Sequence, residues 1–217
     1  MLSSVGLVYV STSGTFGSLV LAREGIPTRA TWASLLSNKR APSFYYIKLV
    51  GIGAKSIWLP IREDLFQIPK SGHGGVIMDT GTTVRSFPKV DYEALRNAFV
   101  AKTTNVPRLP GVEMFDTCYT LTLFVYHIPI VSFYFPSGTI LNVPPNNSLI
   151  VANGGISCLV FASSSFDLSI IGNVQQLKYR LRLIWLLSLW DLVLTIAKFI
   201  LSYCQFLYLV WLVEYVI

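Results

Sequence analysis

The chain has 217 residues, of which 53% are hydrophobic and 13% are charged, and its formal net charge is +6. This composition excludes a disordered protein, and the length suits one domain or slightly more. The basic residues are scattered rather than gathered in a patch with aromatic residues between them, so we expect no nucleic-acid partner. His73 and His127 lie far apart and the three cysteines are too few for a zinc site, so we expect no metal and no cofactor.

Glycine and proline divide the chain into two parts of different character. All 15 glycines and all 11 prolines fall within residues 1–176, whereas residues 177–217 contain neither and are mostly apolar. We therefore expect a turn-rich body over 1–176 and a separate apolar tail over 177–217. The chain opens without a basic segment ahead of the short apolar run Val5 to Val10, so no signal peptide is predicted within this chain.

The body shows many short strands separated by turn residues. Aromatic and β-branched runs predict strands at 18–22, 44–50, 56–60, 74–78, 131–135, 148–151, 156–161 and 168–172. Gly51 and Gly53 are expected to end the second of these strands. The sequence Asn153-Gly154-Gly155 predicts a hairpin turn between two of the later ones.

One helix is predicted in the body, directly after Pro88. Asp91 lies in its first turn, where a negative charge is favourable. Tyr92, Leu95 and Phe99, together with Ala98, then form an apolar stripe with helical spacing. One helix among many strands predicts a mainly β, largely antiparallel domain.

One motif in the body contains a candidate catalytic residue. The apolar run Val76-Ile77-Met78 leads into Asp79-Thr80-Gly81-Thr82. Gly81 allows close approach of the backbone, and the hydroxyls of Thr80 and Thr82 can hydrogen-bond a carboxylate and keep it ionisable. Taken alone, this short motif also suits a purely structural turn at the end of a strand.

Five further motifs, in order along the chain, give this turn its context. The six segments are 43–47, 75–83, 92–99, 115–119, 131–135 and 168–176. With them, residues 43–176 resemble the C-terminal lobe of plant pepsin-like aspartic proteases of the guard-cell and nucellin-like group, a lobe also shared with xylanase inhibitors. Residues 10–42 also resemble the strand and linker that precede this lobe, so we assign residues 1–42 to that segment. The resemblance implies a pepsin-like β lobe with one short helix.

The resemblance implies that Asp79 is the second of two catalytic aspartates. In such enzymes two carboxylates share one proton, and together they activate a water for attack on a peptide bond. The residues that the resemblance places in support of the catalytic loop are Thr80, Gly81, Thr82, Ile171 and Gly172. It further implies a polypeptide substrate and a secreted or extracellular protein.

The resemblance also implies a disulfide between Cys118 and Cys158, with two buried free thiols as the alternative. Cys204 has no counterpart in the family pattern. The triplet Asn146-Asn147-Ser148 is an N-glycosylation sequon, with Asn146 as the acceptor if the chain enters the secretory route.

The chain also departs from the family pattern. Family enzymes have two lobes with one catalytic Asp each, whereas Asp-Thr-Gly occurs once here. Asp64, Asp116 and Asp167 do not lie in comparable settings. We therefore expect an aspartic-endopeptidase lobe that is inactive alone. The alternatives are a non-catalytic protein-binding module, like the xylanase inhibitors, and a truncated gene product. A second copy could in principle supply the other Asp, although nothing in the sequence supports this, and the oligomeric state stays open.

Residues 177–217 leave the family pattern where closing strands would follow. Many leucines and no glycine or proline predict a helix, and we expect that this tail cannot replace the closing strands. One interpretation is membrane association through the tail, although its longest uncharged run, Phe199 to Val213, has 15 residues and a spanning helix needs about 20. The other interpretation is a frameshift or retained intron in the gene.

Overall fold

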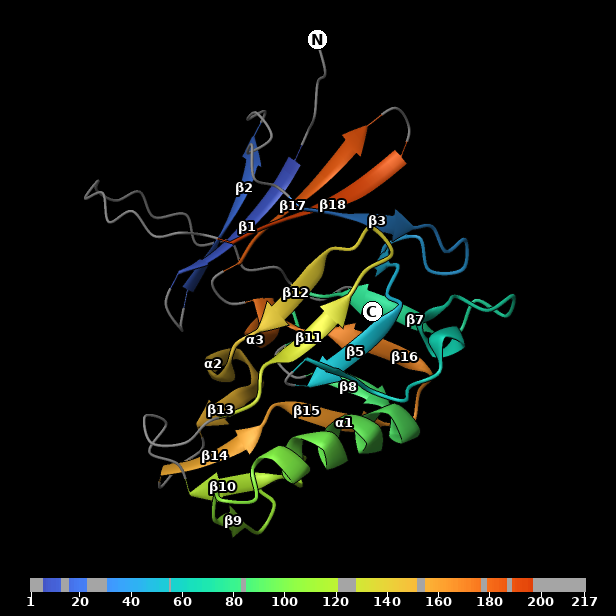
Figure 1. The fold of residues 1–217 in the computed structure, drawn as a ribbon. Coiled ribbons are helices and arrows are strands. Elements are labelled where there is room, and N and C mark those ends of the chain that lie inside the picture. The colour runs from blue at the N-terminus through green and yellow to red at the C-terminus, as the bar shows by residue number, and fades with distance from the viewer. Residues whose placement is uncertain are drawn as a thin grey trace, which may run out of the picture.

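In a computed structural model, the chain forms a mainly β structure with one long helix at one end (Figure 1). The structure describes residues 6–12, 16–22, 31–54, 56–82, 85–120, 128–151, 155–176, 179–186 and 189–196. The mainly β architecture with one principal helix after Pro88 is what the sequence predicts, although at 14 residues this helix is longer than the short one expected.

The secondary structure consists of short strands, one 14-residue helix and three brief helical turns. The strands are β1 (Gly6–Thr12), β2 (Phe16–Ala22), β3 (Thr31–Leu36), β4 (Tyr45–Ile47), β5 (Gly51–Ala54), β6 (Ile57–Trp58), β7 (Gly75–Met78), β8 (Arg85–Pro88), β9 (Arg108–Leu109), β10 (Cys118–Thr120), β11 (Val131–Tyr134), β12 (Ile140–Val143), β13 (Leu149–Val151), β14 (Ile156–Leu159), β15 (Phe161–Ser164), β16 (Leu168–Ile171), β17 (Tyr179–Leu186) and β18 (Leu189–Ile196). The helical segments are the 3-10 turn η1 (Glu63–Phe66), α1 (Lys89–Lys102), α2 (Pro145–Ser148) and α3 (Asn173–Gln176).

The strands form one large sheet and three smaller ones. The large sheet has eight strands in the order β16-β7-β4-β3-β18-β17-β1-β2. Two four-stranded sheets have the orders β13-β14-β10-β9 and β12-β11-β5-β6, and β15 pairs with β8. Most pairs are antiparallel, but β16 runs parallel to β7 and β15 runs parallel to β8. The large sheet therefore joins strands from both ends of the chain to the central strands.

Helix α1 forms where the sequence predicts it, and it covers the core. Its apolar stripe is fully used, because Tyr92, Leu95 and Phe99 are each at most 3% exposed. The Tyr92 hydroxyl donates to the Asp116 carboxylate, which also accepts from the Thr117 hydroxyl at 2.7 Å. These bonds join the helix to the segment that leads into β10.

Two cysteines join neighbouring strands of one small sheet. Cys118 in β10 lies directly opposite Cys158 in β14, and the two form a disulfide with a Cα–Cα distance of 4.0 Å. Both residues are completely buried. The pairing that the family resemblance implies is therefore present in the structure.

Removal of this disulfide should lower the free energy of unfolding markedly. The bond spans 40 positions of sequence, and the chain-entropy model gives about 4 kcal/mol for closing such a loop. Cys158→Ser should therefore unfold at a clearly lower urea concentration than the unchanged chain. Cys204→Ser is the control and should unfold as the unchanged chain does. Equal midpoints for Cys158→Ser and the unchanged chain would contradict this expectation.

The expectation that Gly51 and Gly53 end a strand is wrong. Both residues lie in β5, an inner strand of a four-stranded sheet. A Cβ on Gly51 would overlap the Trp58 ring, and one on Gly53 would lie 2.8 Å from the Tyr134 ring. The two rings stack with their centroids 4.5 Å apart. Glycine is therefore used here because rings from the flanking strands occupy the space above β5.

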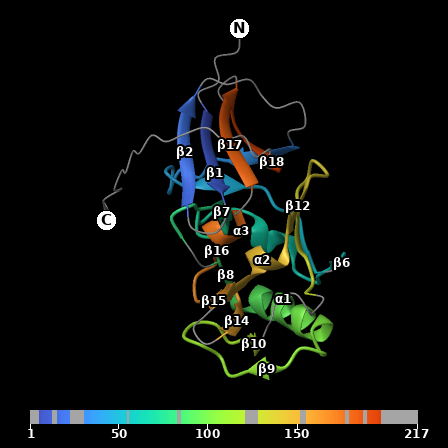
Figure 2. The ribbon, with the colours of Figure 1, turned by 90° about the vertical axis from the view of Figure 1, so that its left-hand side faces the viewer.

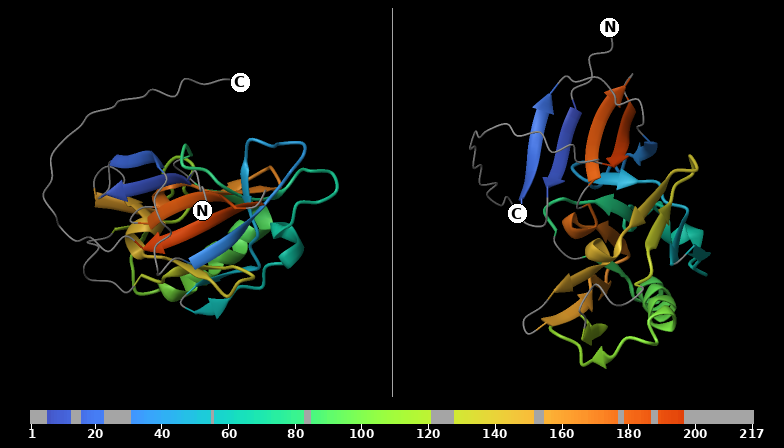
Figure 3. Two further views of the ribbon diagram at one scale, coloured as in Figure 1. Left: turned by 90° about the horizontal axis from the view of Figure 1, so that it is seen from above. Right: turned by 60° about the vertical axis from the view of Figure 1, so that its left-hand side comes forward.

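The prediction of a helical tail that cannot close the sheet is wrong for residues 179–196. These residues form β17 and β18, which pair with each other over their whole length. Strand β17 also pairs with β1, and β18 pairs with β3. Strands β1 and β2 also pair with each other. Figure 2 and the right-hand view of Figure 3 show the pair β1–β2 beside the pair β17–β18, at the end of the molecule away from α1.

Both the local sequence and pairing with distant strands explain why residues 179–196 form strands. Residues 179–183 read Tyr-Arg-Leu-Arg-Leu, an alternation typical of a strand. Leu186 pairs with Leu189, so the two strands need a link of only two residues, which suits a tight hairpin. Strands β1 and β3 each offer an edge to this hairpin, and tertiary pairing overrides the helix propensity of leucine.

Several expectations concern residues outside the described part of the chain. They include Cys204, His127 and the uncharged run Phe199 to Val213. Within the described ranges, no helix is both long enough and apolar enough to cross a membrane.

Candidate functional site

The candidate site lies at the end of β7, in the middle of the fold. The residues of β7 are all buried, and the strand runs directly into Asp79. The backbone N–H of Asp79 donates to the carbonyl of Ile171 at 3.0 Å, so the residue is fixed to the neighbouring strand β16. The Asp79 side chain is half-buried, whereas Thr80 and Gly81 are exposed. The carboxylate therefore stands at the boundary between the core and the solvent.

The turn after Asp79 holds its carboxylate with two hydrogen bonds. The backbone N–H of Gly81 donates to Oδ1 at 2.8 Å, and the hydroxyl of Thr82 donates to Oδ2 at 2.5 Å. These two hydrogen bonds, one to each oxygen, fix the orientation of the carboxylate. A Cβ on Gly81 would lie only 3.3 Å from Oδ1, so glycine suits this position.

Strand β16 and the turn that follows it hold the loop 79–82 in place. The carbonyl of Ile171 accepts from the Gln176 side chain at 2.8 Å as well as from Asp79. The backbone N–H of Asn173 donates to the carbonyl of Thr82 at 2.8 Å, which ties the far end of the loop. Ile171 is completely buried and Gly172 is also buried. The loop is therefore anchored at both of its ends.

The structure distinguishes the two threonines of the motif and adds two residues to the site. Of the hydroxyls that the sequence offers, Thr82 bonds the Asp79 carboxylate, whereas Thr80 points to solvent and makes no such bond in the described structure. Asn173 and Gln176 both hold the loop, a role that their sequence alone does not indicate. A polar run directly after the apolar residues 170–171 is the signal that could have identified them.

The other candidate carboxylates lie in different surroundings. Asp64 pairs with Arg62 on the surface, and Asp116 bonds Tyr92, Thr117 and Arg96. Asp167 is exposed, beside the start of β16. Within the described ranges, the hydrogen bonds to the Asp79 carboxylate come from Gly81 and Thr82 alone, and none of these carboxylates joins it. The described residues therefore present one carboxylate at this site.

The remaining predicted site residues lie away from this loop. Asn146 is exposed in α2, where its side chain is open to modification, while Asn147 and Ser148 of the same sequon are buried. His73 is exposed in a loop. Among the residues that the structure describes, no group of three or more His, Cys, Asp or Glu side chains could hold a metal ion.

A second unusual carboxyl lies at the start of α1. Asp91 is 1% exposed, and neither of its oxygens has a hydrogen-bond partner in the described structure. Pro88 is the N-cap of the helix. Because proline has no backbone N–H, it cannot donate a hydrogen bond to Asp91, three positions later. Burial raises the pKa of the Asp91 carboxyl from 3.8 to about 6, the charge of Asp64 adds to the rise, and Arg62 opposes it.

Asp91 should make the fold more stable in acid than at neutral pH. A carboxyl with a raised folded-state pKa contributes its full stability below the unfolded-state pKa near 4, and this contribution is lost as the pH rises through about 6. We expect a loss on the order of 2 kcal/mol between pH 4 and pH 7. Urea unfolding should show that Asp91→Asn removes this loss and that Glu93→Gln, on the same helix, keeps it. An unchanged pH dependence in Asp91→Asn would show that another group is responsible.

Comparison with known protein families adds an independent observation. Residues 44–183 match the family model described as xylanase inhibitor C-terminal. The match extends past Gln176 into β17, so the family pattern continues beyond the point where the sequence analysis ends it. The domain boundaries at residues 42 and 176 stay predictions.

The curated relatives are plant proteins named as aspartic proteases. Over 189 residues the chain is 44% identical to Protein ASPARTIC PROTEASE IN GUARD CELL 2 of Arabidopsis thaliana, and the match covers 81% of this chain and 40% of the relative. Over 147 residues it is 35% identical to aspartic proteinase nepenthesin-1 of Nepenthes gracilis, which covers 66% of this chain and 33% of that relative. The chain therefore spans less than half of these relatives.

Solved structures show the same fold at low sequence identity. The crystal structure of edgp matches with a TM-score of 0.76 and 17% identity, over 87% of this chain and 53% of that one. Basic 7S globulin from soybean matches with a TM-score of 0.68 and 14% identity, over 89% of this chain and 52% of that one. At these identities the likeness concerns the fold alone.

Proposed function

Because this chain belongs to the family of xylanase inhibitor C-terminal domains, which plant aspartic proteases share, we propose that it is a lobe of an aspartic endopeptidase and supplies Asp79 as one of two catalytic carboxylates. One observation carries the proposal. The Asp79 carboxylate is half-buried at a strand end and is oriented by Gly81 and Thr82. A carboxylate held in this way can exchange a proton with a water without moving.

The reaction requires a second carboxylate opposite Asp79. Two carboxyl groups at short distance cannot both ionise, so the pair holds one proton. The ionised member removes a proton from a water, whose oxygen attacks the carbonyl carbon of the peptide bond, while the other member donates its proton to the carbonyl oxygen. The C–N bond of the tetrahedral intermediate then breaks, as one carboxyl protonates the leaving nitrogen and the other takes a proton from a hydroxyl to leave a carboxylic acid. In this proposal a second lobe supplies the partner carboxylate. The role of this chain is to hold Asp79 at a fixed place and orientation.

The same proposal extends to the substrate and the cellular location. The substrate is a polypeptide, as the names of the relatives indicate for those proteins. The buried disulfide Cys118–Cys158 and the exposed acceptor Asn146 both suit an oxidising, secretory compartment. The role of Gly81, Thr82, Ile171 and Gly172 is to support the catalytic loop.

Complementation with a second lobe tests the function. The chain alone should not cleave a denatured protein at acidic pH, because only half of the carboxylate pair is present. The chain joined to the N-terminal lobe of the Arabidopsis relative should cleave it. Joining the same lobe to a chain with Cys204→Ser is a control that should also be active. A joined protein that is folded but inactive would refute the proposal.

A second function is favoured by the name of the matching family. A xylanase inhibitor C-terminal domain suggests a non-catalytic module that binds another protein. Such a module has no need of the two hydrogen bonds on Asp79. Inhibition of a xylanase by the chain, unchanged in Asp79→Asn, would favour this alternative over the protease lobe.

A further inference from the structure

We propose that the outer face of the sheet β12-β11-β5-β6 binds a neutral oligosaccharide. The site consists of two stacked aromatic rings, Trp58 and Tyr134, and a polar pocket beside them. The pocket has a volume of about 530 Å³, within the range of small-ligand sites. Its neutral hydrogen-bonding groups come from Ser56, Asn105, Ser132 and Asn142, and its apolar wall comes from residues 128–130.

The pocket and the exposed ring of Trp58 lie on one face of this sheet. Asn142 of β12 pairs with Ser132 of β11, which in turn pairs with Gly53 of β5. Gly53 pairs with Trp58 of β6 on its other side. Directly paired residues share a face, so these four form one row across the sheet. Ser132 and Asn142 at one end of the row line the pocket, and Trp58 at the other end is 51% exposed.

This face is the outer one. The opposite face carries Leu141, Phe133 and Ile52, which are each at most 3% exposed and belong to the core. Consecutive residues of a strand point to opposite faces, so the row from Asn142 to Trp58 points away from the core.

The ring of Tyr134 connects the pocket with Trp58. Tyr134 follows Ser132 by two residues on β11 and therefore lies on the same face. A Cβ on Gly53 would lie 2.8 Å from both a ring carbon and the hydroxyl of Tyr134, so the ring reaches over Gly53. Gly53 lies directly between Ser132 and Trp58 in the row. The rings and the pocket therefore form one continuous surface.

The groups that line the pocket suit hydroxyls better than a charged ligand. The Ser132 hydroxyl donates to Oδ1 of Asn142 at 2.7 Å, and within the described residues the amide N–H groups of Asn142 have no partner. None of the described lining residues is a carboxylate, and Lys102 is the one cation among them. Lys102 ends α1, where the partial negative charge of the last carbonyls offsets its own. A sugar hydroxyl both donates and accepts, so it can use all of these groups.

The stacked rings favour a sugar over other polar ligands. One face of a β-linked glucose unit carries C–H groups that pack on an aromatic ring, while the hydroxyls at its rim remain free to form hydrogen bonds. Tryptophan and tyrosine offer such an apolar surface together with a polar tip. Two residue steps, about 7 Å, separate Ser132 from Tyr134 along β11. One sugar unit can therefore lie on the rings while the next enters the pocket.

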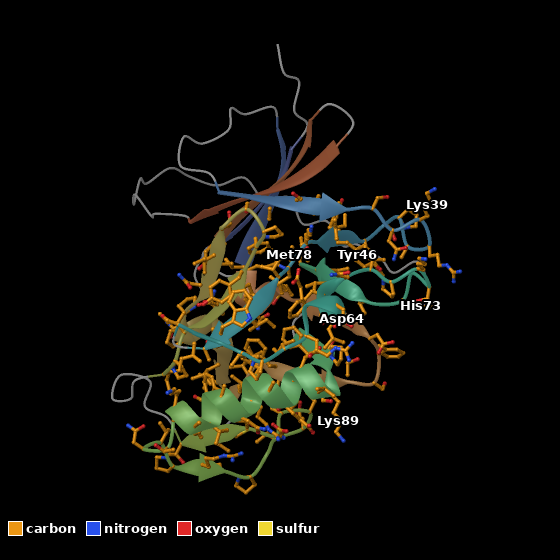
Figure 4. The ribbon with its side chains drawn as sticks, turned by 45° about the vertical axis from the view of Figure 1, so that its right-hand side comes forward. Lys39, Tyr46, Asp64, His73, Met78 and Lys89 are labelled. Atoms are coloured by element: carbon orange, nitrogen blue, oxygen red, sulfur yellow. A yellow bond between two sulfur atoms is a disulfide. The ribbon has the colours of Figure 1, made fainter. Side chains whose placement is uncertain are left out.

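The proposed site lies apart from the Asp79 loop. Asp79 follows β7 and is fixed to β16, and neither strand belongs to the sheet β12-β11-β5-β6. Figure 4 shows α1 running from Lys89 toward the side of the molecule where the gold strands β11 and β12 lie. The C-terminal end of α1 contributes Lys102 to the pocket there. Binding at this site therefore does not depend on the proposed function.

Titration of the full chain with two oligosaccharides tests the inference. Cellohexaose is the neutral probe and hexagalacturonate is the acidic one, and isothermal titration calorimetry measures the binding of each. The chain carries Asn146→Gln, so that no glycan of its own can occupy the site. We expect saturable binding of cellohexaose that is insensitive to salt. Tighter binding of hexagalacturonate would show that Lys102 selects an anion and would overturn the inference.

Matched variants assign the binding to named residues. Trp58→Ala should weaken cellohexaose binding about tenfold, because an aromatic stack contributes this much, and Trp58→Phe should lose less. Asn142→Ala should weaken it about fivefold through the lost hydrogen bond. Ile57→Ala, at the adjacent and equally exposed position, is the control and should bind as the unchanged chain does. Asp79→Asn should also leave the affinity unchanged.

Circular dichroism confirms that each variant is folded. Absence of cellohexaose binding, or unchanged affinity in folded Trp58→Ala, would overturn the inference. Self-association of the chain that is lost in Trp58→Ala, without any sugar binding, would assign this face to a second copy and would also overturn it. Sugar binding that depends on Trp58, together with an inactive joined enzyme, would support the inference and refute the protease function alone.

Discussion

Replacing Asp79 by asparagine is expected to lower kcat of the joined, two-lobed enzyme by a factor of about 10⁴ or more. Asparagine has nearly the same shape and can still accept from the Gly81 N–H, so the loop should keep its conformation. It cannot ionise, however, and therefore cannot share a proton with a second carboxyl. The initial rate of peptide cleavage at acidic pH measures the effect.

Asp167→Asn is the matched control for this substitution. It also removes one carboxylate charge, but from an exposed position that lies outside the Asp79 loop. We expect it to retain most of the activity. A folded Asp79→Asn enzyme with near-normal rates would show that Asp79 has no part in the chemistry.

A proline in the middle of β17 is expected to unfold the protein. Leu183 pairs with Leu7 of β1 on one side and with Leu192 of β18 on the other, so β17 is an inner strand of the large sheet. Proline there removes a ladder hydrogen bond and disturbs the strand, at a cost of about 3 kcal/mol or more. This is a large part of the stability of a typical domain. Circular dichroism during heating should show a strongly lowered melting temperature for Leu183→Pro.

Two comparisons test whether the loss of stability in Leu183→Pro comes from the broken strand rather than from any change in residues 177–217. Leu183→Val retains a residue suited to a strand and should melt close to the unchanged chain. A chain ending at residue 196 keeps both β17 and β18, whereas a chain ending at residue 176 loses the pairs that join β1 to β3. We expect cooperative melting of the first and not of the second. A cooperatively melting 1–176 chain would contradict the assignment of the hairpin to the sheet.

Local patterns predict those elements whose stabilising partners lie nearby in sequence. Helix α1 follows from the apolar stripe Tyr92, Leu95 and Phe99, because helical spacing and burial coincide there. The site loop follows from an apolar strand that ends at Asp79. In both cases the residues that define the element also carry its main contacts, so a short window of sequence is sufficient.

The elements that the sequence mispredicts depend on distant partners. Gly51 and Gly53 indicate a strand end until Tyr134, far along the chain, brings its ring over β5. The leucines of 179–196 favour a helix until β1 and β3 present edges from the other end of the chain.

The most direct test of the account is a titration of the chain into a fixed amount of the N-terminal lobe of the Arabidopsis relative. Acid-dependent cleavage of a fluorogenic peptide is recorded at each ratio. If each site combines one Asp79 with one carboxylate from the other lobe, activity should rise and level off at a one-to-one ratio, and the chain alone should stay inactive. Activity of the chain alone that rises with the square of its concentration would contradict the account and would assign both carboxylates to a pair of identical chains.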